Sequence, residues 1–165
     1  MLSLTLAANT MMAQKYDKIP LKENPVPVTT VKDITGFYGA RMRLNREVYL
    51  KQFPIDQYVS FIEKREHTAW DWTKAEQHGK WVESAYLSAI QADDKELLDK
   101  VDAILNRIIN SQEPEGYVGA TARSFRSAER PLRGMDIYEL YFVVHAFLTV
   151  HEETGNQRAL TAAEK

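Results

Sequence analysis

The sequence predicts an all-α fold, part of a toroid of helical hairpins, preceded by a short extended arm. Residues 134–153 are apolar almost all round, which predicts a helix enclosed by its neighbours. Residues 94–110 carry a single apolar stripe, as expected of an outer, half-solvated helix. A further helical pattern begins at residue 156. Such alternation of outer and inner helices is typical of a toroid whose inner helices surround a central cavity.

Composition narrows the classes of function. The chain has 165 residues, enough for one sizeable core. Its net charge of -2 gives no general attraction to nucleic acid or anionic lipid, so neither partner is expected. Cysteine is absent, which excludes disulfides, thiolate metal sites and a cysteine nucleophile within this chain. The four histidines form no HExxH pattern, and no apolar run approaches the roughly 20 residues that span a bilayer.

The two ends of the sequence have unusual patterns. Residues 1–14 are uncharged, weakly apolar and rich in small residues. They are similar to the end of a secretory signal, which predicts a periplasmic or secreted protein, and a disordered start is the alternative. Residues 156–165 begin a helical pattern that stops without a cap. We therefore expect an N-terminal fragment whose partner is the remainder of the toroid.

Residues 15–36 form the predicted arm. Pro20, Pro25 and Pro27 precede the β-branched run 28–31, which predicts an extended segment ending in a short strand. The toroid is expected from residue 37 to residue 165. Residues 36–39, with two glycines, predict a turn into a helix over 40–51, which Pro54 ends. A shorter helix is predicted over 55–66.

The helical pattern is clearer from residue 79 onward. Apolar residues in 80–91 recur at spacings of three and four, which predicts a helix. Asp93, with Glu96 three residues later, predicts a capping box for the helix over 94–110. Residues 112–134 contain prolines and glycines and predict a long loop. Thr154 and Gly155 are expected to end the enclosed helix.

The enclosed helix carries the first candidate site residues. At 100° per residue, Tyr138, Tyr141 and His145 fall on one side of the helix, and Glu139 falls on another. Tyr138, in the first turn, is the candidate for the mouth of a cavity. Glu139 is either a proton donor with a raised pKa or a carboxylate satisfied by hydrogen bonds. His145 is either a satisfied core histidine or a substrate contact.

Two further candidates lie outside that helix. Arg133 belongs to a loop that also contains Arg123, Arg126 and Arg130. These guanidinium groups would suit an anionic ligand beside a helix N-terminus, or they make ordinary ion pairs on a solvated loop. Trp72 lies near Trp70 and Trp81 in the sequence. An exposed Trp72 ring would stack on a sugar, whereas Trp81 fits the helix stripe and is expected in the core.

Four segments together resemble the N-terminal part of glycoside hydrolase family 127, the β-L-arabinofuranosidase-like family. The segments keep their order and spacing over roughly residues 28–165. They are Phe37-Tyr38-Gly39-Ala40-Arg41 with Asn45-Arg46-Glu47, then Lys80-Trp81-Val82-Glu83-Ser84-Ala85-Tyr86, then Gln112-Glu113-Pro114-Glu115-Gly116-Tyr117-Val118, and Tyr138-Glu139-Leu140-Tyr141 followed by His145. Tyr138 stands where the family has a histidine on the substrate side, and Val144 stands where it has a glycine.

The resemblance implies a partial (α/α)6 toroid from a retaining glycosidase that acts on plant-type polysaccharide side chains. It implies that Tyr138 walls the sugar pocket, with Glu139, His145, Arg133 and Trp72 as weaker candidates. In typical members a zinc-bound cysteine is the nucleophile and a glutamate the acid/base, and both would lie beyond residue 165. The resemblance thus implies zinc in a longer parent protein, no metal in this chain, and no hydrolysis by this chain alone.

Two alternatives remain open from the sequence. One is another six-hairpin glycosidase or lyase for acidic sugars, which the arginine-rich loop favours. The other is a non-enzymatic helical binding module that is complete at this length.

Overall fold

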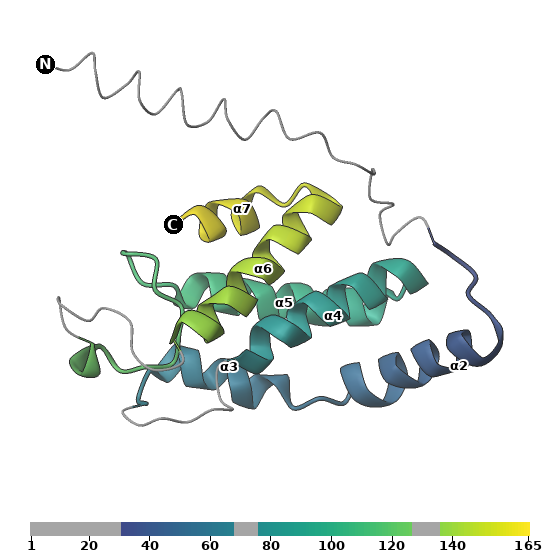
Figure 1. The fold of residues 1–165 in the computed structure, drawn as a ribbon, viewed down its shortest axis with the longest axis horizontal. Helices are drawn as coiled ribbons and strands as arrows, with labels where there is room; N and C mark the ends of the chain where they lie inside the picture. Colours follow the sequence, from purple (N-terminus) through teal and green to yellow (C-terminus); the bar gives the residue numbers. More distant parts are fainter. Residues whose placement is uncertain (1–30, 68–75, 127–135) are drawn as a thin grey trace, which may run out of the picture.

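The computed structural model describes residues 31–67, 76–126 and 136–165. Figure 1 shows the helices into which these ranges fold. They are α2 (Gly36–Leu44), the π-helical η2 (Asn45–Leu50), α3 (Ile55–Lys64), α4 (Glu76–Ala92), α5 (Lys95–Ser111), the short 3₁₀ turn η3 (Arg123–Phe125), α6 (Asp136–Thr154) and α7 (Gln157–Glu164). In these ranges, pairing of extended backbone is limited to an isolated bridge between His67 and Thr121. The predicted all-α class is confirmed.

The helices pack in two layers. α4 and α6 contact each other and form the inner layer, whereas α3, α5 and α7 cover them from outside (Figure 1). α4 and α6 run in the same direction, since Lys80 contacts Tyr138 and, further along both helices, Glu83 contacts His145. Parallel inner helices joined through antiparallel outer helices are the arrangement of a helical toroid, and the described chain forms part of one.

The inner layer depends on a close approach at Gly79. A Cβ atom placed there would lie 2.6 Å from the carbonyl oxygen of Phe142 and 2.7 Å from the amide nitrogen of Val143. Only glycine leaves room for the α6 backbone at this distance. The contact lets the apolar side chains of α4 and α6 interlock in one core, which includes Trp81, Val82, Ala85, Val143, Ala146, Phe147 and Val150.

The prediction that residues 134–153 are enclosed on every side is wrong for the described chain. In α6 the side chains of Ile137, Tyr138, Tyr141 and Leu148 are exposed, from 38% for Leu148 to 69% for Ile137. The helix is apolar on two faces, and α4 and α7 cover one of them. The enclosed helix is instead α4, which has contacts with η2, α3, α5 and α6 and in which Ser84 is the one exposed residue.

Two predicted boundaries also differ. The predicted turn over 36–39 is the first turn of α2, and Gly39 is needed because a Cβ atom there would collide with the carbonyl of Ile34. The cap of α5 is Asp94, whose side chain accepts a hydrogen bond from the Leu97 N–H at 3.1 Å. Asp93, the predicted cap, lies outside the helix with a φ of 53°.

The other helices follow the prediction closely, except that the chain is already helical at Glu76, four residues before the predicted start of α4. α7 confirms the helical pattern after residue 156, and its cap is Asn156, whose side chain accepts hydrogen bonds from two backbone N–H groups. The predicted signal remnant and most of the predicted strand lie outside the described residues. No helix in the described ranges is long and apolar enough to cross a membrane.

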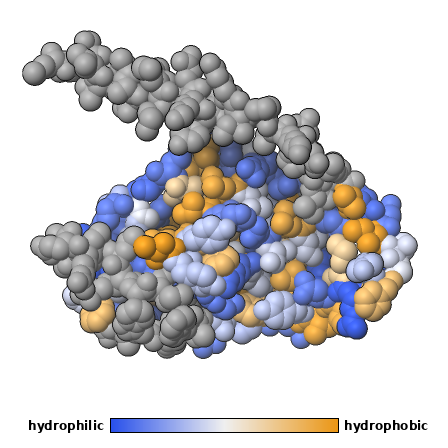
Figure 2. Space-filling model, viewed as in Figure 1, coloured by the Kyte–Doolittle hydropathy of each residue, from blue (hydrophilic) through white to orange (hydrophobic). Residues whose placement is uncertain are grey.

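Apolar side chains also reach the surface at the end of the molecule that α2 forms (Figure 2). They include Phe37, Tyr38, Leu44, Val48 and Tyr49, all more than half exposed.

Candidate functional site

The exposed face of α6 carries three of the residues that the helical wheel groups together. Tyr138, Tyr141 and His145 all lie on this face, which we call the α6 aromatic face. Neighbouring rings contact one another along the helix. The ring of Tyr138 meets that of Phe142 edge-on, with 4.9 Å between centroids, and the centroids of Tyr141 and His145 lie 5.8 Å apart. Aromatic rings supported in this way present flat apolar surfaces with polar edges.

Lys80 of α4 lies against this face. Its Nζ donates a hydrogen bond to the Tyr138 hydroxyl at 3.3 Å and lies 4.3 Å from the centroid of the Phe142 ring. Glu76, one turn earlier in α4, pairs with the same Nζ at 3.0 Å. Burial disfavours the charged amine, but the bonds to Glu76 and Tyr138 outweigh it and raise the pKa of Lys80. The group is therefore a cation at neutral pH, held by a carboxylate and two aromatic rings.

His145 forms a second polar pair with α4. Its Nδ1 lies 3.1 Å from the Oε1 of Glu83, and both side chains are partly exposed, at 48% and 27%. The carboxylate orients the imidazole ring and favours a proton on Nδ1, which leaves Nε2 free to accept a hydrogen bond when the ring is neutral. An ammonium, a phenol and an oriented imidazole thus lie side by side on one surface with aromatic rings.

Glu139 is not part of this group. It lies on the opposite, buried face of α6 with Val143 and Ala146, as the helical wheel predicts. The structure therefore separates the predicted acid from Tyr138 and His145. Arg133 and Trp72, the other predicted site residues, lie outside the described ranges.

The sequence left two alternatives for the arginine-rich loop, an anion site or ordinary ion pairs, and the described arginines form ion pairs. Arg123 pairs with Glu115 at 2.9 Å, and Arg126 pairs with Glu113 at 2.7 Å. The side chain of Arg126 is 8% exposed, and its guanidinium lies over the ring of Tyr117, 3.6 Å from the centroid. Both guanidinium groups therefore form ion pairs within the loop.

Sequence reasoning missed Lys80 and Glu83 as site residues. One sequence pattern could have indicated them. A polar stripe runs along a mostly apolar helix, because Glu76, Lys80 and Glu83 follow one another at spacings of four and three. That stripe could be assigned to the site only once α6 was known to lie beside α4.

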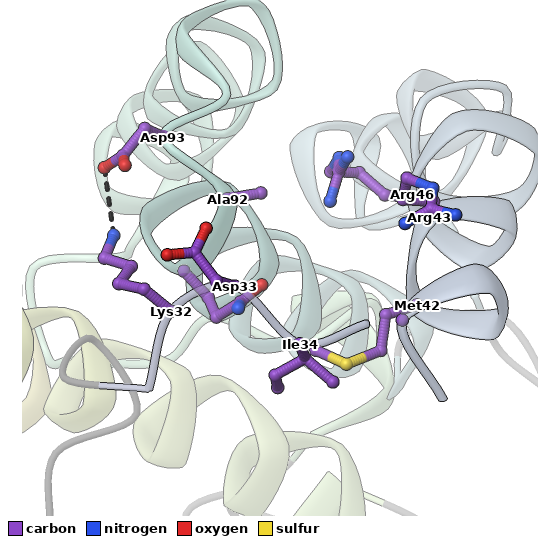
Figure 3. Close-up of a pocket in the computed structure, with 10 residues that line it drawn as sticks. Lys32, Asp33, Ile34, Met42, Arg43, Arg46, Ala92 and Asp93 are labelled. Atoms are coloured by element: carbon purple, nitrogen blue, oxygen red, sulfur yellow. Dashed lines mark hydrogen bonds and ion pairs between the residues drawn. The ribbon is translucent and has the colours of Figure 1, made fainter. Parts of the chain in front are cut away.

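A separate cleft opens at the opposite end of α4 (Figure 3). Its volume is about 390 Å³, and it lies between α2, residues 32–34 and the end of α4. Lys32 crosses one side of it and pairs with Asp93 at 3.0 Å, while Arg43 and Arg46 face it from the other side (Figure 3). None of the predicted site residues lines this cleft.

The described residues do not fit a zinc site. The chain has no cysteine, and within residues 31–67, 76–126 and 136–165 no three histidine, aspartate or glutamate side chains come together as ligands would. No catalytic step is assigned to zinc in this chain.

Comparisons with known proteins give one family match and one fold match. The model of the β-L-arabinofuranosidase GH127 catalytic domain matches residues 27–165. The solved structure of a GH127 β-arabinofuranosidase superposes with a TM-score of 0.65 at 23% identity, which supports the fold. That match covers 86% of this chain and 26% of the solved chain, so the present chain spans about a quarter of that protein. No curated protein matches the chain. By the extent of the family match, the chain belongs to the GH127 catalytic-domain family.

Proposed function

We propose that this chain contributes one wall of the sugar pocket of a glycoside hydrolase that acts on β-L-arabinofuranosides of plant-type polysaccharides. The observation that supports this most is the α6 aromatic face with Lys80 and Glu83 beside it. Membership of the GH127 family supplies the class of substrate. Because the chain spans only 26% of the solved relative, the activity of a whole enzyme is part of the proposal.

In this proposal each group has a separate role. The ring of Tyr138 stacks against the C–H face of the sugar, and its edge contact with Phe142 keeps the ring in place. Lys80 donates hydrogen bonds to ring hydroxyls, and His145, oriented by Glu83, offers its Nε2 as a hydrogen-bond partner. Recognition by aromatic faces and a few convergent polar groups is typical of small-ligand sites.

In this proposal the catalytic groups lie outside this chain. We propose that the nucleophile, the acid/base and the zinc of the family mechanism belong to the remainder of the toroid. That remainder would also cover Ile137 and Leu148, the aliphatic residues on the exposed side of α6. The isolated chain is then expected to bind sugar weakly and to hydrolyse none.

Export belongs to the same proposal, because such polysaccharides are outside the cell. It rests on the composition of residues 1–14. N-terminal sequencing of the protein recovered from the periplasm or medium tests it, and an intact residue 1 on cytoplasmic protein alone would contradict it.

Tyr138 gives the direct test of sugar binding. Titration of the chain with methyl β-L-arabinofuranoside, followed by NMR, is expected to shift the signals of the α6 aromatic face. An aromatic contact is worth about 0.5–1.5 kcal/mol, so Tyr138→Ala should weaken binding roughly two- to twelvefold. Tyr138→Phe keeps the ring and should lose less.

Tyr49→Ala is the matched control, because Tyr49 is an exposed tyrosine on η2, away from α6. Equal affinities for Tyr138→Ala, Tyr49→Ala and the unmodified chain would rule out the proposed pocket wall.

Acidic sugars are the weaker alternative. Arg123 and Arg126 already pair with glutamates, so binding of an acidic sugar would depend on Arg130 and Arg133. Tighter binding of galacturonic acid than of the arabinofuranoside would favour that alternative.

A further inference from the structure

The first described residue of α6, Asp136, is held by the loop that follows α5. Asp136 is 2% exposed. Its Oδ1 accepts one hydrogen bond from the Tyr117 hydroxyl at 2.7 Å and another from the Thr121 hydroxyl at 2.8 Å. Two hydroxyl donors on one carboxylate oxygen fix the position of that carboxylate, because bonds to a charged acceptor are short and strong.

The loop is folded around Tyr117. The backbone N–H of Thr121 donates to the Tyr117 hydroxyl at 3.1 Å, so this oxygen both accepts and donates. A Cβ atom at Gly119 would lie 2.4 Å from the same oxygen, which explains the glycine there. Burial raises the pKa of Tyr117, so the hydroxyl keeps the proton that it donates to Asp136.

The ring of Tyr117 is fixed as well. The Arg126 guanidinium lies 3.6 Å from the ring centroid, and Glu113 holds that guanidinium at 2.7 Å. Arg65, just after α3, approaches the same glutamate at 3.5 Å. Its Nη2 also donates to the carbonyl oxygen of Ser111 at the end of α5. The position of the Tyr117 hydroxyl is therefore set by groups from α3, α5 and the loop.

We propose that Asp136 is a positioning residue, which transmits the fixed position of Tyr117 to the first turn of α6 and thereby sets the place of Tyr138. Tyr138 follows Asp136 by two residues in that turn. The consequence for sugar binding rests on the proposed function, whereas the effect on the helix does not.

Hydrogen exchange measured by mass spectrometry tests the helix directly. The variants are Asp136→Ala, Asp136→Asn and Tyr117→Phe, with Asp99→Ala as the control, because Asp99 is an exposed carboxylate on α5 paired only to Lys95 among the described residues. The amides of residues 140–144 bond back to the first turn of α6. Exchange of these amides should rise at least tenfold in Asp136→Ala and Tyr117→Phe, while α5 keeps its protection.

Asp136→Asn is the conservative variant, since its amide oxygen still accepts from both hydroxyls. We expect its exchange to stay within about threefold of the unmodified chain, because both hydrogen bonds survive. Exchange in α6 that is unchanged in both disruptive variants would overturn the proposal. So would an equal rise in α5 and α6, because the residues would then act through overall stability. If Asp136→Ala does not fold, Tyr117→Phe alone decides.

A second readout follows Tyr138 itself. Lys80 lies over the rings of Tyr138 and Phe142, so its ε-methylene protons should be shifted upfield in NMR spectra. That shift should shrink in Tyr117→Phe and persist in Asp136→Asn, and an unchanged shift in Tyr117→Phe would count against the proposal. Titration with methyl β-L-arabinofuranoside separates the two hypotheses: a disordered first turn with unaltered sugar affinity supports the positioning role and refutes the pocket wall.

Discussion

The buried histidine of α4 predicts a marked loss of stability in mild acid. His78 is fully buried beside Gly79, and neither ring nitrogen has a hydrogen-bond partner among the described residues. Burial lowers the pKa of His78 from 6.5 to about 3. The folded chain therefore keeps His78 neutral at any pH above about 4, whereas the unfolded chain protonates it below 6.5. Between these values the unfolded state binds more protons, so stability falls as the pH falls.

The size of the effect follows from the two pKa values. With a folded pKa near 3 and an unfolded pKa of 6.5, lowering the pH from 7.5 to 5 should cost about 2 kcal/mol. This result is insensitive to the folded value so long as it stays below about 4. The pKa values of Glu63 and Asp94 are lowered from 4.5 and 3.8, so these carboxylates lose their contribution at lower pH. The interval from 5 to 7.5 therefore isolates histidine.

Urea unfolding followed by circular dichroism at pH 7.5, 6 and 5 measures this cost. His78→Leu should remove most of the pH dependence, because leucine has a similar volume and no group to protonate. At pH 7.5 it should be as stable as the unmodified chain or more stable, since it replaces two unpaired nitrogens. The exposed His145→Gln serves as the control and should keep the dependence. A His78→Leu variant with the same loss between pH 7.5 and 5 would refute the reasoning.

Three further predictions concern the packing of α4 and α5. Gly79→Ala should cost about 1–3 kcal/mol, seen as a lower Tm, because its Cβ would press on the Phe142 carbonyl; an unchanged Tm would contradict the close approach. Asp94→Ala should cost about 1 kcal/mol in urea unfolding and Asp94→Asn less, and equal losses would argue against the cap. Trp81→Phe removes the 3.0 Å hydrogen bond from the indole to the Leu50 carbonyl, and should lower the free energy of unfolding by about 1–3 kcal/mol in the same assay. An unchanged free energy of unfolding would argue against that hydrogen bond.

Periodicity predicted the helices well because the apolar stripes are regular. The stripe of α5 predicted its buried residues, and the helical wheel correctly placed Tyr138 and His145 on a different side of α6 from Glu139. What periodicity could not reveal is which apolar faces this chain covers itself. An all-round apolar helix such as α6 stays half exposed when only one side has neighbours.

The predicted cap of α5 was wrong, because two adjacent residues both fit the sequence pattern of a helix cap. Asp93 and Asp94 are adjacent acids before an apolar stripe, and each could cap the helix. Asp94 is the cap in the structure, because the backbone of Asp93 has a left-handed conformation. Asp94 also forms an ion pair with Lys51 at 2.9 Å. That partner is distant in sequence, so no local pattern could identify it.

Only the site residues that share one helix could be predicted from the sequence. Tyr138 and His145 follow from the wheel of one helix, but their partners Lys80 and Glu83 come from another. Conversely, the sequence left open whether the loop arginines bind an anion or form ion pairs, because the glutamates that pair with Arg123 and Arg126 lie about ten residues earlier.

The fold and the candidate site share one determinant, the approach of α4 to α6 at Gly79. The side chains that meet across this contact are Lys80 with Tyr138 and Glu83 with His145, one and four residues further along α4. A larger residue at position 79 must move α6 outward, so it should lower stability and also lengthen the contact between Lys80 and Tyr138. His78, one residue earlier, is fully buried, and its ring nitrogens bond to no described group, so His78→Leu should change stability and its pH dependence alone. If Gly79→Ala lowered the Tm yet left the upfield shift of the Lys80 protons intact, the spacing of the two helices would not control the site.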